Sequence, residues 1–285
     1  MAGISTNRTN IALPTELSAE IMAKTQEQSA VMQLARQIAL PGRGLTIPVI
    51  TSDPVAEWVE ETGAKPVSNP ELSQKIMQAH KLAVIVPFSM EFRRDAASLY
   101  DALVERLPLA LAARFDGAVF GTETAPAANF DTFASATAQS IATGVEYAGL
   151  VAADEDIATH GGIMNGIVLA PQGKSALLSA LDGDNRPLFI NNISEGAVPM
   201  VLGAKTILSK AAYKSGTPSI VGIAGDWSQA MFGTVEGVRV TYSEDTAVTI
   251  GGELVSLFEH NMFAVRAEIE VGFRADVSVF NKLTV

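Results

Sequence analysis

The sequence predicts a mixed α+β protein with an extended β-hairpin near its N-terminus. Apolar residues recur every four positions between residues 95 and 121, which indicates a long helix with one buried face. Residues 146–181 alternate between helical and strand patterns, and several short strand-like segments follow from residue 200 onward. Residues 50–88 have the pattern of two extended arms around a tip rich in glycine and proline.

The N-terminal residues predict a polar arm, then a helix, then a strand. Residues 1–13 are small and polar, and we expect them to form a flexible arm. Pro14 suits the first turn of a helix, and apolar residues at helical spacing extend the predicted helix over residues 15–39. Pro41 and the glycines after it end this helix, and Leu45–Val49 has a strand pattern.

The predicted hairpin consists of arms at residues 50–66 and 70–88. At about 3.3 Å per residue, arms of about a dozen residues span roughly 40 Å. A two-stranded ribbon of that length is marginal in water unless it lies on another surface. Trp58 is expected on this exposed ribbon, and tryptophan is a common anchor in protein interfaces. The alternative is that Trp58 packs against the body of its own chain.

The rest of the chain predicts a long helix followed by mixed and then β-rich structure. Pro108 falls inside the long helix and is expected to kink it. Residues 122–144 read as a loop that leads into a strand. The predicted strands are Gly166–Leu169, Met200–Leu208, Ser219–Ala224, Ala230–Phe232, Val238–Tyr242 and Phe263–Val271, and further helices are predicted at Gly173–Leu181 and Glu253–Asn261.

The composition favours a protein that covers apolar surface with other protein chains. Apolar residues make up 48% and charged residues 18%, against roughly 25% charged residues in ordinary soluble proteins. The most apolar stretch, Leu82–Phe88, is too short to cross a membrane, so no membrane partner is expected. The absence of cysteine excludes disulfides, and the net charge of −11 excludes coating of nucleic acid by basic patches. An acidic protein can still enclose nucleic acid.

No catalytic, cofactor or metal site is predicted, and the chain is not expected to be an enzyme. The GKS sequence at residues 173–175 lacks the glycine that a phosphate-binding loop needs at position 168, so a helix start is the better interpretation. His80, His160 and His260 have no nucleophile or metal partner in a recognisable pattern. A role in capping a helix end is expected for His260.

The charged residues near the hairpin are interpreted as solvated or as partners between subunits. Glu60 and Glu61 lie on an exposed ribbon, where a catalytic pKa shift is not expected. Arg93 and Arg94 flank acidic residues, which favours ion pairs within or between subunits over phosphate binding. The predicted interface residues of the extended loop and its base are Trp58, Glu60, Glu61, Lys65, Arg93 and Arg94.

Several short motifs in collinear order identify a family. The hairpin has an AxWVxE pattern at residues 56–61, and residues 81–95 read KxAxxxPxSxExxxD. Residues 183–189 are similar to a GRPLF-like segment, and GDWSQAMFG at 225–233 is similar to GDFSQxxIG. Phe263 to Arg266 resemble a closing ALA-V-R-like element. In these motifs the chain resembles the major capsid proteins of tailed bacteriophages, the phage capsid family with the HK97-like fold.

The resemblance implies a domain plan and a function. It implies an N-terminal arm (1–49), an extended loop across a neighbouring subunit (50–85), a peripheral domain with a spine helix (86–140 and 251–285) and an axial domain (141–250). It implies self-assembly through hexamers and pentamers into an icosahedral head that encloses double-stranded DNA. The protein would be made and assembled in the host cytoplasm and would reside in the virion. Implied partners are a separate scaffold or maturation protease, a portal and a decoration protein.

Two alternatives stay open, together with two expectations about assembly. An encapsulating nanocompartment of the same fold would carry enzyme cargo, and a β-rich enzyme with an unrecognised site would remain a small oligomer. Some family members join subunits by a lysine–asparagine bond, and Lys65 or Lys75 with Asn281 would be the partners here. We expect no such cross-link. We also expect salt to promote assembly, because it screens repulsion between acidic subunits.

Overall fold

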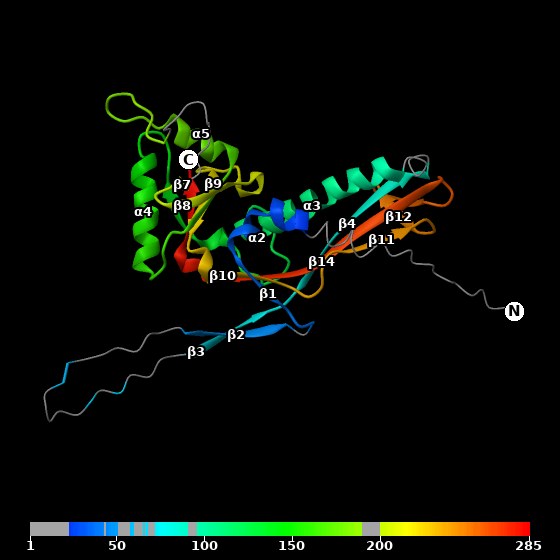
Figure 1. Ribbon diagram of the computed structural model, residues 1–285, viewed down its shortest axis with the longest axis horizontal. Coiled ribbons are helices and arrows are strands. Elements are labelled where there is room, and N and C mark those ends of the chain that lie inside the picture. Colours follow the sequence, from blue (N-terminus) through cyan, green and yellow to red (C-terminus); the bar gives the residue numbers. More distant parts are fainter. Residues whose placement is uncertain are drawn as a thin grey trace.

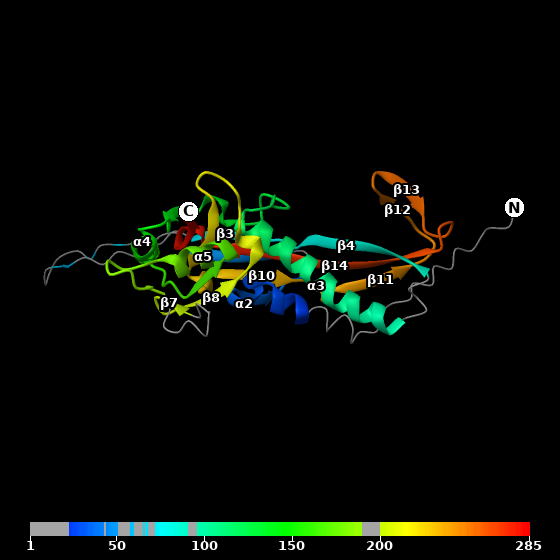
Figure 2. The ribbon, with the colours of Figure 1, turned by 90° about the horizontal axis from the view of Figure 1, so that it is seen from above.

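The computed structural model describes residues 23–42, 44–50, 58–59, 65, 67, 72–90, 96–189 and 200–285. In this part of the chain a long helix runs beside a long central strand, and a second sheet with its own helices lies toward one end (Figures 1 and 2). The mixed α+β class predicted from the sequence is confirmed. None of the described helices has the length and apolar character needed to cross a membrane.

The helices follow local sequence patterns closely. The predicted long helix is confirmed as α3 (Ala96–Phe120), with Pro108 inside it. Helix α4 (Glu146–Thr159) and helix α5 (Pro171–Ser179) lie on either side of a short strand in sequence, as predicted, and Pro171 occupies the first turn of α5. The short 3-10 helices are η2 (Phe133–Ser135), η3 (Lys210–Ala212), η4 (Trp227–Gln229) and η5 (Val277–Val279).

A six-stranded sheet forms one half of the described body. Its strands lie in the order β5 (Thr137–Ser140), β15 (Phe280–Thr284), β9 (Ile220–Gly225), β6 (Gly166–Leu169), β8 (Ala204–Leu208) and β7 (Met200–Val201). Strand β6 is parallel to β8 and antiparallel to β9. All four β6 residues are buried, as their continuous apolar sequence requires.

A five-stranded sheet forms the other half, and its centre is β14 (Met262–Ala275). Strand β4 (His80–Ser89) pairs with β14 from Met262↔Ser89 to Val271↔His80. Strands β11 (Arg239–Ser243) and β10 (Ala230–Thr234) pair with other parts of β14, and β1 (Arg36–Ala39) lies parallel to β10. Helix α3 runs along this sheet (Figure 2).

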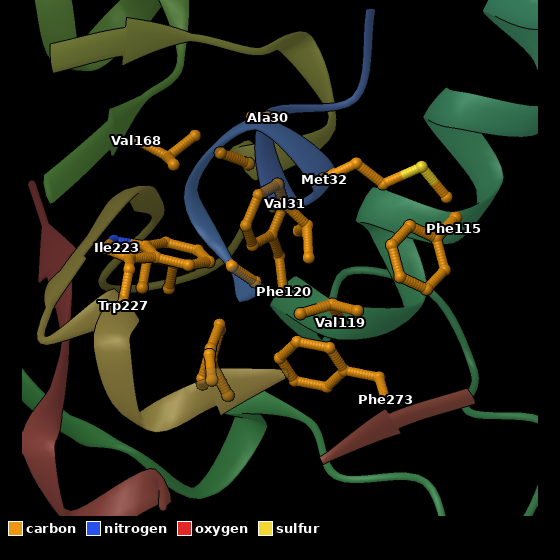
Figure 3. Packing of buried hydrophobic residues seen from close by; sticks show 14 of the residues in the cluster. Ala30, Val31, Met32, Phe115, Val119, Phe120, Val168, Ile223, Trp227 and Phe273 are labelled. Carbon is orange, nitrogen blue, oxygen red and sulfur yellow. The ribbon is translucent and has the colours of Figure 1, made fainter. Parts of the chain in front are cut away.

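The two sheets share one core of aromatic side chains. Phe133 stacks on Phe280 with ring centroids 4.3 Å apart, and both meet the edge of Trp227. The ring centroids of Phe133 and Phe273 on β14 are 5.7 Å apart, so the cluster joins the two sheets. Figure 3 shows Trp227 and Phe273 in this core. The indole nitrogen of Trp227 donates a hydrogen bond to the carbonyl of Gly166 at 3.0 Å. Burial of such rings is the dominant stabilising term in a core of this kind.

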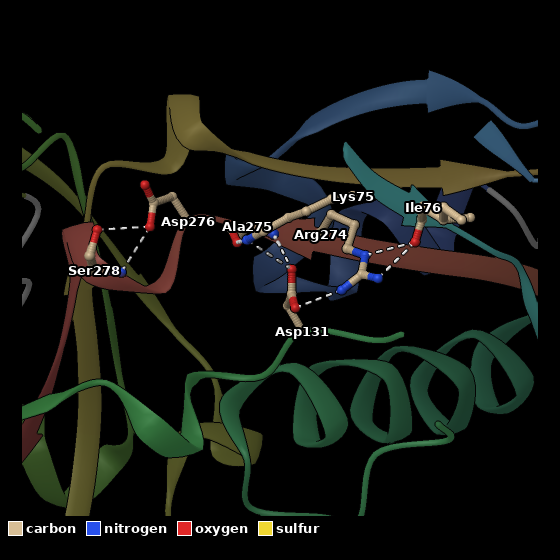
Figure 4. Close-up of polar contacts among 7 residues, drawn as sticks. All are labelled: Lys75, Ile76, Asp131, Arg274, Ala275, Asp276 and Ser278. Carbon is tan, nitrogen blue, oxygen red and sulfur yellow. Dashed lines mark hydrogen bonds and ion pairs between the residues drawn. The ribbon is translucent and has the colours of Figure 1, made fainter. Parts of the chain in front are cut away.

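The chain passes between the two sheets at two similar turns. Between β9 and β10, Asp226 accepts hydrogen bonds from the backbone and hydroxyl of Ser228 at 3.0 and 2.6 Å. Between β14 and β15, Asp276 accepts the same pair of bonds from Ser278 at 3.1 and 2.7 Å (Figure 4). In each turn the aspartate caps a short 3-10 helix, which ends one strand and redirects the chain.

Three sequence-based assignments are wrong. Residues 36–39 do not continue the N-terminal helix, because they pair with β10. In that region residues 23–28 are helical and a separate helix, α2 (Ala30–Leu34), is capped by Ser29. Glu253–Asn261 is not helical either: Glu253–Ser256 is strand β13, which pairs with β12 (Ala247–Ile250) across a turn at Gly251 and Gly252. Consequently His260 does not cap a helix.

The predicted second arm of the hairpin belongs to two sheets. Residues 72–77 form β3, whereas residues 80–89 form β4 in the large sheet, because β4 supplies a ten-residue partner for β14. Sheet membership also crosses the predicted boundary at residue 250. Strands β10 and β11 pair with β14, and β15 pairs with β9. The domain boundaries stay a prediction. Strand pairing favours placing residues 230–250 with the peripheral domain and residues 280–285 with the axial domain.

Candidate assembly surface

A two-stranded ribbon projects from the body below the two main sheets (Figure 1). It consists of β2 (Leu45–Ile50) and β3 (Leu72–Met77), which pair antiparallel from Leu45↔Met77 to Ile50↔Leu72. The ribbon thus pairs the strand predicted at residues 45–49 with part of the predicted second arm, whereas most of the predicted first arm (residues 50–66) lies outside the described residues. Because a ribbon of two strands gains little from its own packing, its direction depends on how its base is attached.

The first attachment is apolar. Met77 ends β3 and is completely buried, whereas its neighbour Ile76 is 49% exposed. Two glycines make room for the Met77 side chain. A Cβ at Gly233 would lie 3.0 Å from the Met77 sulfur, and a Cβ at Gly272 would lie 3.1 Å from the Met77 Cγ. Gly44 has φ +83°, and a Cβ there would lie 2.7 Å from the Met77 carbonyl oxygen. Only glycine fits this backbone conformation and this close approach without strain.

The second attachment is an ion-pair network beneath the ribbon (Figure 4). Arg274 on β14 donates from Nε and Nη2 to the carbonyl oxygen of Ile76 at 3.0 and 2.7 Å. Its Nη1 donates to Asp131 at 2.8 Å. The Arg274 and Asp131 side chains are only 12% and 18% exposed. Because water screens this pair poorly, it holds the ribbon more firmly than a surface ion pair would.

The remaining bonds of the network fix β3 and the Asp131 loop to the end of β14. The Lys75 ammonium donates to the carbonyl of Ala275 at 3.1 Å and lies 3.8 Å from Asp131. The backbone N–H of Ala275 donates to the second Asp131 oxygen at 3.2 Å. Asp131 thus accepts hydrogen bonds from the Arg274 side chain and the Ala275 backbone of β14, and its carboxylate also faces Lys75 of the ribbon. This arrangement satisfies a nearly buried carboxylate and orients the ribbon at the same time.

The N-terminal segment is attached to α3 by a buried carboxylate. Asp116 accepts hydrogen bonds from the Ser29 hydroxyl at 2.5 Å and from the Ala30 N–H at 2.8 Å, and the Val31 N–H lies at 3.4 Å. Ser29 in turn accepts from Met32 N–H at 3.1 Å. Burial raises the pKa of Asp116 to about 6, although these hydrogen bonds act in the opposite direction. The attachment therefore depends on the protonation of one aspartate.

The structure describes two of the six predicted interface residues. The side chain of Trp58 is 105% exposed and Lys65 is also exposed. Glu60, Glu61, Arg93 and Arg94 lie outside the described residues. Their role at an interface stays a prediction.

The residues that hold the ribbon and the N-terminal segment escaped prediction from sequence. Asp131 and Arg274 are 143 positions apart, and Ser29 and Asp116 are 87 positions apart. No local motif connects the members of either pair.

Exposed apolar side chains occur at other projecting elements as well. On the β12–β13 hairpin and the turn after it, Leu254 and Phe258 are 75% and 76% exposed. At the β7–β8 edge of the six-stranded sheet, Met200, Leu202 and Leu208 are also exposed. Such residues are typical of surfaces that other protein chains cover.

The three histidines occupy structural positions. His80 lies 3.0 Å from the Asn129 side-chain oxygen, and its ring meets the edge of Phe130. His160 and His260 each contact a backbone carbonyl four residues earlier, at 2.8 and 2.9 Å. In the described part of the chain, histidine and acidic residues form no group that could hold a metal ion.

Comparisons with known proteins agree on one family. A model described as "Phage capsid family" matches residues 9–279. The "Probable major capsid protein gp17" of Mycobacterium phage D29 is 28% identical over 295 aligned residues, which cover 95% of this chain and 89% of that protein. A solved structure from Gordonia phage Cozz is 22% identical, with a TM-score of 0.71, and the match covers 90% of this chain and 86% of that one.

A second solved structure extends the likeness to the whole chain. It is the capsid of a native GTA particle, with a TM-score of 0.65 and 15% identity, and the match covers 100% of this chain and 95% of that one. At these identities the two structures show the fold, which is the HK97-like fold predicted from the sequence.

Proposed function

This chain belongs to the phage capsid family, and we propose that its copies assemble through hexamers and pentamers into an icosahedral shell that encloses double-stranded DNA. The protein is a major capsid protein, a structural protein of the virion whose function is self-assembly rather than catalysis. The observation that carries the proposal is the ribbon, which is attached at its base by a nearly buried ion pair while the side chain of Trp58 is fully exposed.

The ribbon lies across a neighbouring subunit in this proposal. Its base is attached by the buried Met77 and by the Arg274–Asp131 pair, so β2 and β3 leave the body in the same direction in every copy. A preoriented loop loses less conformational entropy on binding than a free one. We propose that Trp58, Glu60, Glu61, Lys65, Arg93 and Arg94, the interface residues predicted from the sequence, contribute to this contact.

Assembly by many weak contacts fits the surface chemistry. The loop and the apolar residues on β12–β13 and β7–β8 are separate patches, so one subunit can contact several neighbours at once. Individually weak contacts also allow misplaced subunits to leave. Because the chain carries a net charge of −11, we propose that repulsion keeps free subunits apart at low ionic strength.

No covalent cross-link between subunits is part of the proposal. Asn281, the predicted asparagine partner, is completely buried on β15, and its amide donates to the carbonyl of Ala153 at 3.1 Å. Lys75 is engaged in the network beneath the ribbon. We propose further that a separate scaffold or maturation protease, a portal and a decoration protein act with this chain, and that assembly takes place in the host cytoplasm.

Negative-stain electron microscopy of the purified protein across a range of salt concentrations tests the proposal. We expect hollow polyhedral particles, or free hexamers and pentamers, with more particles as salt increases. A monodisperse monomer or dimer under every condition would contradict self-assembly by this chain. Enzyme cargo in place of DNA inside particles from an infected host would favour a nanocompartment.

A further inference from the structure

A cavity of about 300 Å³ lies between α3, β4 and the loop that follows α3. Its floor is apolar and buried, and is formed by Phe115, Ala118 and Phe130. Its rim includes Ala83 and Thr124, which are exposed. Ligand pockets range from about 300 to 1,000 Å³, so a cavity of this size suits one large side chain better than a helix or strand.

Trp58 is a large apolar side chain whose burial in such a cavity would be favourable. Trp58 is more exposed than any other large apolar residue of the described chain, so it does not fill its own subunit's cavity. An exposed tryptophan leaves a large apolar surface in contact with water, which is unfavourable. Tryptophans at interfaces typically bind in apolar pockets of the partner.

Resting on the proposed shell function, we propose that Trp58 of one subunit inserts into the Phe115–Phe130 cavity of the neighbouring subunit. Every copy then supplies both the side chain and its pocket at different places on its surface. Such a contact is heterologous, and it closes into a ring when the rotation between subunits divides the circle evenly. Rings of this kind are the hexamers and pentamers of the proposed shell.

Charge supports this pairing. Lys81 and Arg114 line the cavity, and their side chains are 72% and 50% exposed. Among the described residues each has one carboxylate partner in its own subunit: Glu270 lies 3.2 Å from Lys81, and Glu123 pairs with Arg114. Lysine has three donors and arginine five, so both can bond further acceptors.

The segment around Trp58 supplies those acceptors, because residues 57, 60 and 61 are glutamates. The guanidinium of Arg114 can also approach the indole face, an arrangement that strengthens when water is excluded.

Cysteine cross-linking tests the contact directly, because the native chain has no cysteine. The test pair is Val59→Cys with Thr124→Cys, which keeps Trp58 and places thiols beside it and on the cavity rim. The matched control pair is Val59→Cys with Gln172→Cys, since Gln172 is exposed on α5, a helix that contributes no residue to the cavity lining. A short bismaleimide reagent is added to assembled particles, and oligomers are separated on a denaturing gel.

We expect a ladder of linked subunits for the test pair, at least tenfold stronger than for the control pair. Addition of Trp58→Ala to the test pair should reduce the ladder by at least about tenfold, as expected for loss of an interface anchor. Val67→Ala, which removes another exposed apolar side chain of the same loop, should leave the ladder unchanged.

Intact particles without a ladder, or equal ladders for both pairs, would overturn the proposed contact and leave the shell function standing. Failure of the unmodified protein to form particles under any condition would overturn the proposed function and this contact with it.

Discussion

Removal of Arg274 should destabilise the subunit more than removal of any exposed arginine on the same strand. Arg274→Ala removes two bonds to the Ile76 carbonyl and the ion pair with Asp131. Hydrogen bonds from charged groups contribute about 1.5–3 kcal/mol, and breaking a fully buried ion pair costs about 3–5 kcal/mol. Asp131 keeps the Ala275 N–H and Lys75 as partners. We therefore expect Arg274→Ala to lower the free energy of unfolding by about 3 kcal/mol.

Arg266 on the same strand provides the control. Its side chain is 46% exposed and lies 3.5 Å from Glu268, so Arg266→Ala should cost less than about 1 kcal/mol. Urea unfolding of the free subunit at low salt measures both values. Fluorescence of the buried Trp227 reports the transition, because its surroundings change completely on unfolding. Equal losses in the two variants would refute the view that the network anchors the ribbon.

Three further predictions address the N-terminal segment, the ribbon turn and assembly. Because the folded pKa of Asp116, about 6, lies above the ordinary value of 3.8, its contribution to stability is complete below pH 4 and is lost as pH rises through 6. Asp116→Asn should remove this pH dependence, which amounts to a loss on the order of 2–3 kcal/mol in the free energy of unfolding between pH 4 and 8. The control Asp184→Asn, at an exposed position, should leave the dependence unchanged. Parallel curves of stability against pH for Asp116→Asn and the wild type would contradict the assignment to Asp116. Gly44→Ala should cost about 1–3 kcal/mol in urea unfolding, because its φ of +83° and the 2.7 Å approach to Met77 suit only glycine. Gly42→Ala, with open space around the new methyl group, should cost less than about 1 kcal/mol, and a similar cost at both sites would argue against strain at residue 44. Light scattering should show faster assembly at moderate than at low salt, and identical rates would mean that charge repulsion does not control assembly.

Local patterns predicted the elements whose stability comes from nearby residues. Helix α3 was visible because its buried face repeats every four residues, and β6 was visible as a short apolar run between two helical segments. Local patterns assign β1 and β13 to helices, and both assignments are wrong, because these strands depend on partners elsewhere in the chain or on a glycine turn.

The attachment of the ribbon could not be derived from sequence for a related reason. Lys75, Asp131 and Arg274 are ordinary charged residues until β14 brings them together. Trp58, by contrast, is predicted from the sequence as an interface residue, because a tryptophan on a ribbon without a local core favours an external partner. The structure leaves its side chain fully exposed, and its contact with a neighbour stays a prediction.

Replacement of the loop with its base kept intact tests most directly whether the loop joins neighbouring subunits. A variant in which a short glycine-serine turn replaces residues 51–71 retains β2, β3 and the Arg274 network. Sedimentation velocity, with circular dichroism as a check on folding, compares it with the wild type at moderate salt. We expect particles for the wild type and a folded, unassembled subunit for the variant. Particles of the same size from both proteins would contradict the claim that the loop joins neighbouring subunits.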